Sequence, residues 1–198
     1  MTHRSWLAIP LLIITTALSP ALAAPVPIRQ VGAQSDWSTP ASALRRFVST
    51  GEIHDRGLLV LLEHAGWSSD ELRFGLSRNY RVDPVLLASF LNGERGERFL
   101  AKHLGTYGPS GAPRTALVAM RSAILAASSD GLLSSMELLD QLPTDFELRH
   151  QVGTKLAAMP VCGKAAGMKD ERSRSWLSWL VFLPACLQAE SAFVKAKP

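Results

Sequence analysis

The chain has 198 residues, of which 21 are lysine or arginine and 17 are aspartate or glutamate, so its formal net charge at pH 7 is +4. This excess is small and scattered, and no basic stripe with interleaved aromatic side chains accompanies it, which argues against nucleic acid as a partner. The length suits one domain with a single hydrophobic core and is too short for two comfortable domains.

The N-terminus has the pattern of a secretory signal peptide. A basic start leads into an apolar stretch over residues 6–18, and Ala21-Leu22-Ala23 supplies the small residues of a cleavage site. The stretch is too short to cross a bilayer, which needs about 20 apolar residues. We therefore expect residues 1–23 to be a signal peptide, cleaved after Ala23 during export to the periplasm. An uncleaved N-terminal anchor is the alternative.

Residues 24–40 are rich in Pro, Gln, Ser and Gly and show no periodicity, which predicts a flexible leader. Ordered structure is predicted to begin at Ala41. Short helices are predicted over residues 41–49, from Asp55 to Gly66, and over residues 70–76, the last of them started by a capping box of Ser68 and Glu71.

The strongest helix start lies at Asp83, an N-cap residue followed by proline at the first helical position. A further helix is predicted over residues 94–104, where Glu94 stands four residues before Arg98, the favourable orientation for a surface ion pair. The charged block that surrounds this pair is typical of a solvated helix face, and a charged docking surface is the alternative.

The helix predicted over residues 114–127 is apolar on nearly all sides, which places it at the centre of a bundle. Arg121 within it would be a buried structural charge and would need a carboxylate or carbonyl partner. Ser134 or Ser135 can cap one more helix, which Pro143 ends. Together these elements predict an all-α fold, a bundle of five to seven short helices over residues 41–149. Residues 146–149 alternate like a short strand.

Residues 150–198 are predicted to form a basic C-terminal extension that contains both cysteines, Cys162 and Cys186. Paired thiols usually join in an oxidising compartment, so we expect a structural disulfide between them. It would close a ring of about 25 residues and stabilise the fold by roughly 3 kcal/mol on the chain-entropy model. A metal site or a redox pair would require CxxC spacing or a nearby histidine, and neither is found.

The same extension contains an aromatic run from Trp176 to Leu183. The favoured interpretation is a helix that packs back on the bundle. Tryptophans beside a basic flank are also typical of an interfacial membrane element, and exposed aromatic surface marks partner-binding sites. In those alternatives the contact surface would include Trp176, Trp179 and Phe182.

Several segments resemble a known family, namely the helical domain of unknown function found mainly ahead of α/β-hydrolase domains in cyanobacterial proteins. The resemblance covers about residues 41–149 and is carried by LRRFVSTGEI, ASFLNGERGERFLAKHLG, ALVAMRSAILAA and GLLSSMELLDQLPTDFEL. It implies a helical module that accompanies hydrolases, adds the thylakoid lumen as a second candidate destination, and brings no catalytic residues. Nothing after Leu148 resembles the hydrolase domain itself.

A serine hydrolase of the α/β type needs the elbow G-x-S-x-G after a strand, followed by an acidic residue and a histidine. The nearest match is GPSGA at residues 108–112, with Ser110 as the candidate nucleophile. Its fifth residue is alanine, and no β-branched run precedes it. Only His150 lies downstream, and the intervening aspartates are Asp130, Asp140 and Asp145. We therefore lean against an enzyme.

The four histidines that follow the predicted signal peptide, His54, His64, His103 and His150, show neither HxxxH nor HxH spacing, so we expect no metal site. No phosphate-binding glycine motif is present, and no cofactor is expected. His54 beside Asp55 is more typical of a helix cap with an exposed neighbour than of an acid/base pair. The sequence thus predicts an exported, non-catalytic interaction or accessory module with an envelope protein partner. A hydrolase of the α/β-hydrolase-associated family and a peripheral membrane-surface protein are the alternatives.

Overall fold

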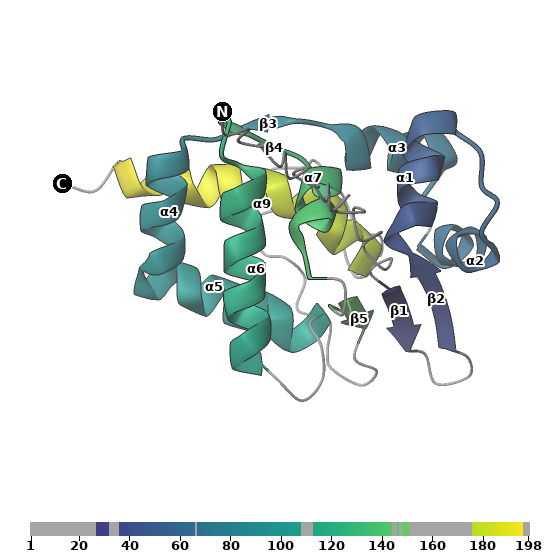
Figure 1. Cartoon of the computed structure of the whole chain (residues 1–198), viewed down its shortest axis with the longest axis horizontal. Coiled ribbons are helices and arrows are strands. Elements are labelled where there is room, and N and C mark those ends of the chain that lie inside the picture. Colours follow the sequence, from purple (N-terminus) through teal and green to yellow (C-terminus); the bar gives the residue numbers. More distant parts are fainter. Residues whose placement is uncertain are drawn as a thin grey trace, which may run out of the picture.

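The computed structural model describes residues 27–31, 36–65, 67–107, 113–143, 146, 148–150 and 176–195. Within these residues eight helices and five short strands are formed (Figure 1). The helices are α1 (Ala41–Thr50), α2 (Arg56–Ala65), α3 (Ser69–Ser77), α4 (Pro84–Asn92), α5 (Glu94–Tyr107), α6 (Pro113–Ala127), α7 (Ser135–Gln141) and α9 (Trp176–Lys195). The predicted all-α class is confirmed, with seven helices between Ala41 and Gln141 and the eighth in the C-terminal extension.

The strands form two small sheets. In the first, β1 (Pro27–Val31) lies between β2 (Asp36–Pro40), which is antiparallel to it, and β5 (Leu148–His150), which is parallel. In the second, β3 (Tyr80–Arg81) pairs antiparallel with β4 (Leu132–Leu133). The predicted strand near residues 146–149 corresponds to β5. The expectation of a flexible leader is corrected for β1 and β2, whose backbone groups pair with each other, and β1 also pairs with β5, more than 100 residues away.

The predicted helix starts are confirmed by their hydrogen bonds. Asp83 accepts from the backbone N–H groups of Val85 and Leu86, and Pro84 follows as the first helical residue. Capping boxes begin two further helices, Ser68 with Glu71 at α3 and Ser134 with Glu137 at α7. These contacts satisfy backbone donors that have no partner inside a helix.

Helix α9 fills the centre of the fold and shares one hydrophobic core with α1–α7. Figure 1 shows it in yellow, crossing the molecule past α4 and α7. Seven of its apolar side chains are at most 2% exposed: Leu177, Trp179, Leu180, Val181, Leu183, Cys186 and Leu187. The expected C-terminal extension is therefore part of the helical domain in this helix, as the favoured interpretation of the aromatic run predicts. No helix among the described residues is long and apolar enough to span a membrane.

Polar contacts fix α9 along its length. Ser178 Oγ accepts from Trp67 Nε1 at 2.9 Å, and Gln188 Nε2 donates to the Arg81 carbonyl at 2.6 Å. The α3–α9 contact is also close, because a Cβ atom on Gly75 would lie only 2.6 Å from Val181 Cγ1. Two hydrogen bonds, ten residues apart along the helix, and a close glycine contact therefore define how α9 packs in the core.

Pro184 interrupts the hydrogen bonds of α9 and is compensated from outside the helix. Proline has no N–H, so the carbonyl of Leu180, four residues earlier, lacks its helical donor. Ser135, at the start of α7 and fully buried, donates its hydroxyl to this Leu180 oxygen at 2.8 Å. One side chain thus satisfies a buried carbonyl that the proline leaves unpaired.

We predict that Ser135→Ala lowers the unfolding free energy by about 1–3 kcal/mol, because the Leu180 carbonyl is then buried without a donor. In a Pro184→Ala background the same substitution should cost about 1 kcal/mol or less, because the N–H that Pro184→Ala introduces can donate to Leu180. Urea denaturation of the wild type, both single variants and the double variant measures the coupling. Equal costs of Ser135→Ala in the two backgrounds would refute the compensation.

Candidate functional site

Several residues singled out from the sequence lie outside the described residues. These are Ser110, Asp145 and Cys162, together with the side chains of His64, His150 and Trp176. Cys186 is 1% exposed in the core face of α9. Since Cys162 lies outside the described residues, the disulfide between the two cysteines stays a prediction.

The proposed aromatic contact surface in α9 is corrected by burial. Trp179 is 1% exposed and is among the largest fully buried side chains of the core. Phe182 packs against that core, and its ring lies 5.8 Å from the ring of Trp67. Trp179 therefore cannot form a membrane or partner surface, and Phe182, which is partly buried, uses much of its apolar area in intramolecular contacts.

Arg121 also differs from expectation. It is half-buried on α6, and its Nε has no hydrogen-bond partner in the part of the chain that the structure describes. The predicted carboxylate or carbonyl partner is not found there. Leu117 and Leu125, one turn to either side on α6, are likewise half-buried, so Arg121 lies at the margin of the core, with its Nε atom buried.

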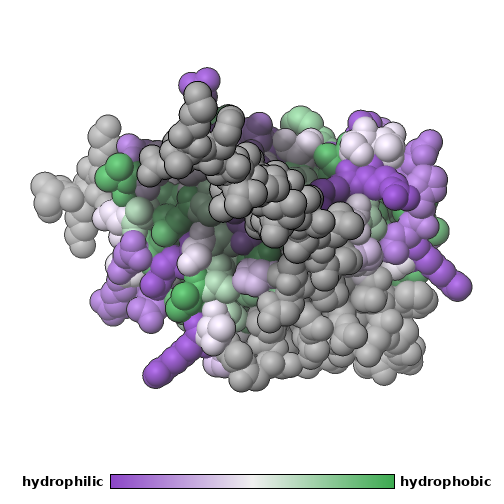
Figure 2. Space-filling view, viewed as in Figure 1, coloured by the Kyte–Doolittle hydropathy of each residue, from purple (hydrophilic) through white to green (hydrophobic). Residues whose placement is uncertain are grey.

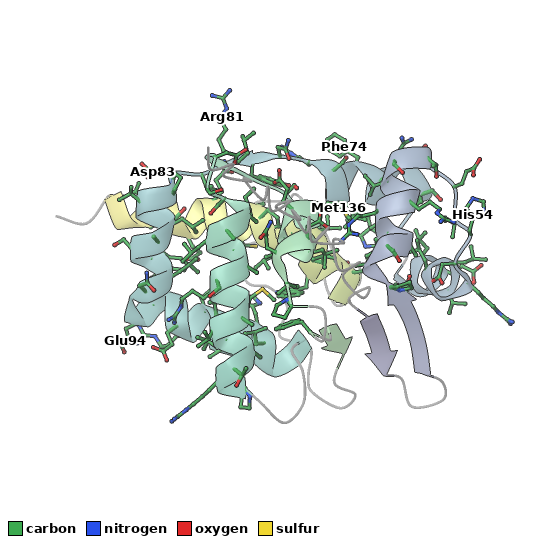
Figure 3. All side chains as sticks on the ribbon, viewed as in Figure 1. His54, Phe74, Arg81, Asp83, Glu94 and Met136 are labelled. Carbon is green, nitrogen blue, oxygen red and sulfur yellow. The ribbon has the colours of Figure 1, made fainter. Side chains whose placement is uncertain are left out.

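A hollow of about 260 Å³ lies between the start of α1 and the loop that precedes α2. Its lining consists of Pro40, Ser42, Ala43, Arg46, His54 and Asp55. It belongs to a polar side of the protein, since Figure 2 shows purple, hydrophilic side chains at the right-hand edge, where Figure 1 places α1, α2 and α3. Figure 3 shows His54 at the same edge. This hollow is the candidate functional site.

The polar groups of the hollow have identifiable roles. Asp55 accepts from the backbone N–H of Leu58 at 2.8 Å and therefore caps α2, as the sequence indicates. His54 Nε2 lies 2.8 Å from a carboxylate oxygen of Glu52, but the two side chains are 59% and 67% exposed. Water competes for both partners, so this pair is weak.

Chemically, the hollow could accept a small polar group. Pro40, the residue before α1, has no side-chain acceptor for the backbone N–H groups of the first helical turn. These N–H groups can therefore donate to a ligand, as can the guanidinium of Arg46. A hydroxyl, an imidazole and a carboxylate are present in Ser42, His54 and Glu52, yet no hydrogen bond joins Ser42 to His54. The sequence did not single out Ser42, Arg46 or Glu52, because no spacing rule links the start of a helix to a loop ten residues later.

His103 is the clearest case of a histidine used for packing. It is 7% exposed on α5, and its ring lies 4.3 Å from that of Phe99, one turn earlier. Burial, aided by the positive charge of Lys102, lowers its pKa from 6.5 to about 4. No group of three or more His, Cys, Asp or Glu side chains able to hold a metal occurs among the described residues.

The charged block of α5 has one structural role beyond solvation. Glu94 and Arg98 form the predicted surface ion pair. Arg95 reaches across to α9, where it lies 2.6 Å from the buried carboxylate of Glu190 and 5.5 Å above the ring of Phe193. Arg95 therefore ties α5 to α9 in addition to facing water.

Comparison with known proteins identifies the family. The model of the family described as "alpha/beta hydrolase of unknown function (DUF1400)" matches residues 32–148. The chain belongs to this family. The match agrees with the resemblance noted over residues 41–149, whereas no curated protein and no solved structure matches. Helix α9 lies beyond the matched DUF1400 segment although it fills the core of that segment.

The DUF1400 description names a hydrolase, but the matched segment has a different architecture in its described residues. An α/β-hydrolase presents its nucleophile on a turn between a strand and a helix. Within the described ranges the sheets have three and two strands, and β1 with β5 is their sole parallel pair. The α/β architecture that the description names is thus not seen in these ranges.

Proposed function

We propose that this protein is an exported, non-catalytic helical module that accompanies an α/β-hydrolase of the envelope. One observation carries the proposal: apart from the exposed pair of His54 and Glu52, many of the described side chains that could act as acids or bases are committed to folding. Asp55, Asp83, Glu71 and Glu137 cap helices. Asp140 pairs with Arg45 at 2.5 Å. Glu190 pairs with Arg95, and His103 is stacked in the core.

A folding role and a catalytic role make opposite demands on a side chain. A general base must lie within hydrogen-bond distance of a substrate proton, whereas a capping carboxylate already accepts hydrogen bonds from backbone N–H groups. The family membership supports association with a hydrolase, because the family description refers to that enzyme class. Export is supported by the signal-peptide pattern of residues 1–23.

A hydrolase is the second candidate, and two observations favour it. The family description names this activity, and the hollow at α1 places Ser42 and His54 in one lining, with Glu52 at 2.8 Å from the imidazole. A serine, a histidine and a carboxylate are the residue types of acyl-transfer sites. Ser110, from the sequence GPSGA, is the other serine to be tested.

We predict that a fluorophosphonate probe leaves the purified, oxidised protein unlabelled, because no activated serine is expected. Wild type, Ser42→Ala and Ser110→Ala are compared side by side, with an active serine hydrolase as the positive control and heat-denatured protein as the background. Labelling of the wild type that disappears in one serine variant would overturn the non-catalytic proposal and identify the nucleophile.

The accessory role requires a separate experiment. Tagged protein is cross-linked in intact cells, and captured proteins are identified by mass spectrometry and then co-purified as recombinant pairs. The proposal requires that a purified α/β-hydrolase binds the module directly. If none binds in reciprocal experiments with ample material, the association with hydrolases is wrong.

A further inference from the structure

An aromatic and cationic cluster projects from the end of α3 and from β3. Phe74 is 65% exposed, and it is one of two exposed phenylalanines among the described residues. The guanidinium of Arg78 lies 5.8 Å from the centre of the Phe74 ring and 5.0 Å from the centre of the Tyr80 ring. Two cation–π contacts thus hold one arginine between two aromatic rings.

The cationic groups of this cluster are available for an external ligand. Neither Arg78 nor Arg81 makes a side-chain hydrogen bond or ion pair with another described residue, and both are exposed. Figure 3 shows Arg81 extending from the upper edge of the molecule, with Phe74 on the same edge. The backbone beneath them is fixed, because the Arg81 carbonyl accepts from Gln188 at 2.6 Å and Arg81 pairs with Leu132 across the small sheet.

Acidic side chains near the cluster are largely engaged elsewhere. Glu71 accepts from Ser68 within the capping box, Asp83 accepts from the first backbone N–H groups of α4, and Asp130 accepts from Leu132 N. Among the acidic residues close to the cluster in sequence, Asp70 makes no hydrogen bond of this kind within the described region. It lies at the start of α3, one turn before Phe74. The two arginines consequently keep unsatisfied donors beside an exposed ring.

We propose that Phe74, Arg78, Tyr80 and Arg81 form a contact surface for an anionic lipid bilayer. Phe74 enters the boundary between headgroups and acyl chains, and the two guanidinium groups bind lipid phosphates. A fixed, projecting ring with flanking cations needs no partner of matching shape, since every phospholipid presents a phosphate and an anionic bilayer adds a net negative charge that attracts the two arginines. A protein interface would instead require roughly 800 Å² on this side, with an apolar centre, and one exposed phenylalanine beside a half-buried tyrosine does not supply it.

The surface is distinct from the aromatic run of α9, whose Trp179 is buried. It is also independent of the proposed association with a hydrolase, since a module can bind an enzyme on one side and a membrane on another. A negative result with lipids would leave the accessory role untouched, and a missing hydrolase partner would leave the lipid surface untouched.

Flotation with vesicles tests the proposal. Purified oxidised protein is used, and mass spectrometry of its N-terminus ensures that residues 1–23 are absent. One sample is mixed with vesicles of phosphatidylcholine alone, and another with vesicles that also contain phosphatidylglycerol. The wild type should float with the anionic vesicles only, and raised salt should release it. Phe74→Ser should weaken partitioning about tenfold or more, and Arg78→Gln and Arg81→Gln about fivefold each.

The matched control is a double substitution on another helix, Val118→Ser with Arg114→Gln, which removes one exposed apolar side chain and one exposed arginine from α6. It should float like the wild type, and thermal melts must show that every variant is folded. Three outcomes would overturn the proposal. The first is that the wild type does not float with anionic vesicles. The second is that the control variant loses flotation as strongly as Phe74→Ser does. The third is that Phe74→Ser loses hydrolase binding while no form of the protein binds vesicles, which would assign the surface to a protein.

Discussion

Replacing Trp179 by alanine should lower the free energy of unfolding by about 3–5 kcal/mol, the largest effect that we expect from a single substitution in this protein. Trp179 is 1% exposed in the first turn of α9, and the neighbouring core residues Leu180 and Val181 are equally buried. Removing the indole leaves a cavity that a close-packed core can fill only in part. Urea denaturation followed by far-UV circular dichroism gives the value.

Phe193→Ala is the matched control, because Phe193 is an aromatic residue of the same helix but is 54% exposed. Its loss should cost no more than about 1 kcal/mol, since little apolar area is buried there and only the contact with Arg95 disappears. If Trp179→Ala were as mild as Phe193→Ala, the placement of α9 at the centre of the core would be wrong.

The second large effect is a loss of stability in acid, caused by His103. Folding lowers the pKa of this imidazole from 6.5 to about 4. Above pH 6.5 the side chain is neutral in both states, and the folded protein keeps its full stability. Between pH 6.5 and 4 the unfolded chain binds a proton that the folded chain does not, so stability falls as the pH falls. The complete loss is about 3 kcal/mol, of which about 2 kcal/mol should appear between pH 7 and pH 5.

His103→Phe keeps a ring for stacking on Phe99 but cannot bind a proton. Its unfolding free energy, measured by urea denaturation from pH 7.5 to 4, should fall by about 2 kcal/mol less than that of the wild type between pH 7 and pH 5. Parallel pH curves for wild type and His103→Phe would show that His103 is not protected from protonation.

The sequence was most informative where local chemistry decides the structure. The helix starts at Ser68, Asp83 and Ser134 depend on side-chain oxygens that bond to backbone groups two or three residues away, so they can be recognised from spacing alone. The interpretation of Asp55 as a cap was confirmed for the same reason. The all-α class follows from several such local patterns in succession.

Contacts between distant segments were beyond this kind of prediction. The run from Trp176 to Leu183 is apolar on most sides, and periodicity cannot distinguish burial in a protein core from contact with a membrane. The strands β1 and β2 carry polar sequences, and β1 also pairs with a distant strand, β5, near residue 150. The hollow at α1 and the cluster around Arg78 arise where separate elements meet, so no motif in the sequence indicated them.

The central position of α9 also has a consequence for how the chain folds. Its contacts bridge very long stretches of sequence, as in the hydrogen bonds between Trp67 and Ser178, 111 residues apart, and between Arg81 and Gln188, 107 residues apart. Bringing such distant segments together lowers the conformational entropy of the chain before any contact between them has formed. Folding rates therefore fall as contacts become less local. Until residues 176–187 have been synthesised, we expect the core side chains of α1–α7 that pack against α9 to stay uncovered. The protein should therefore fold slowly for a helical chain of its size, and the segment that defines its family should remain incomplete while it is being made.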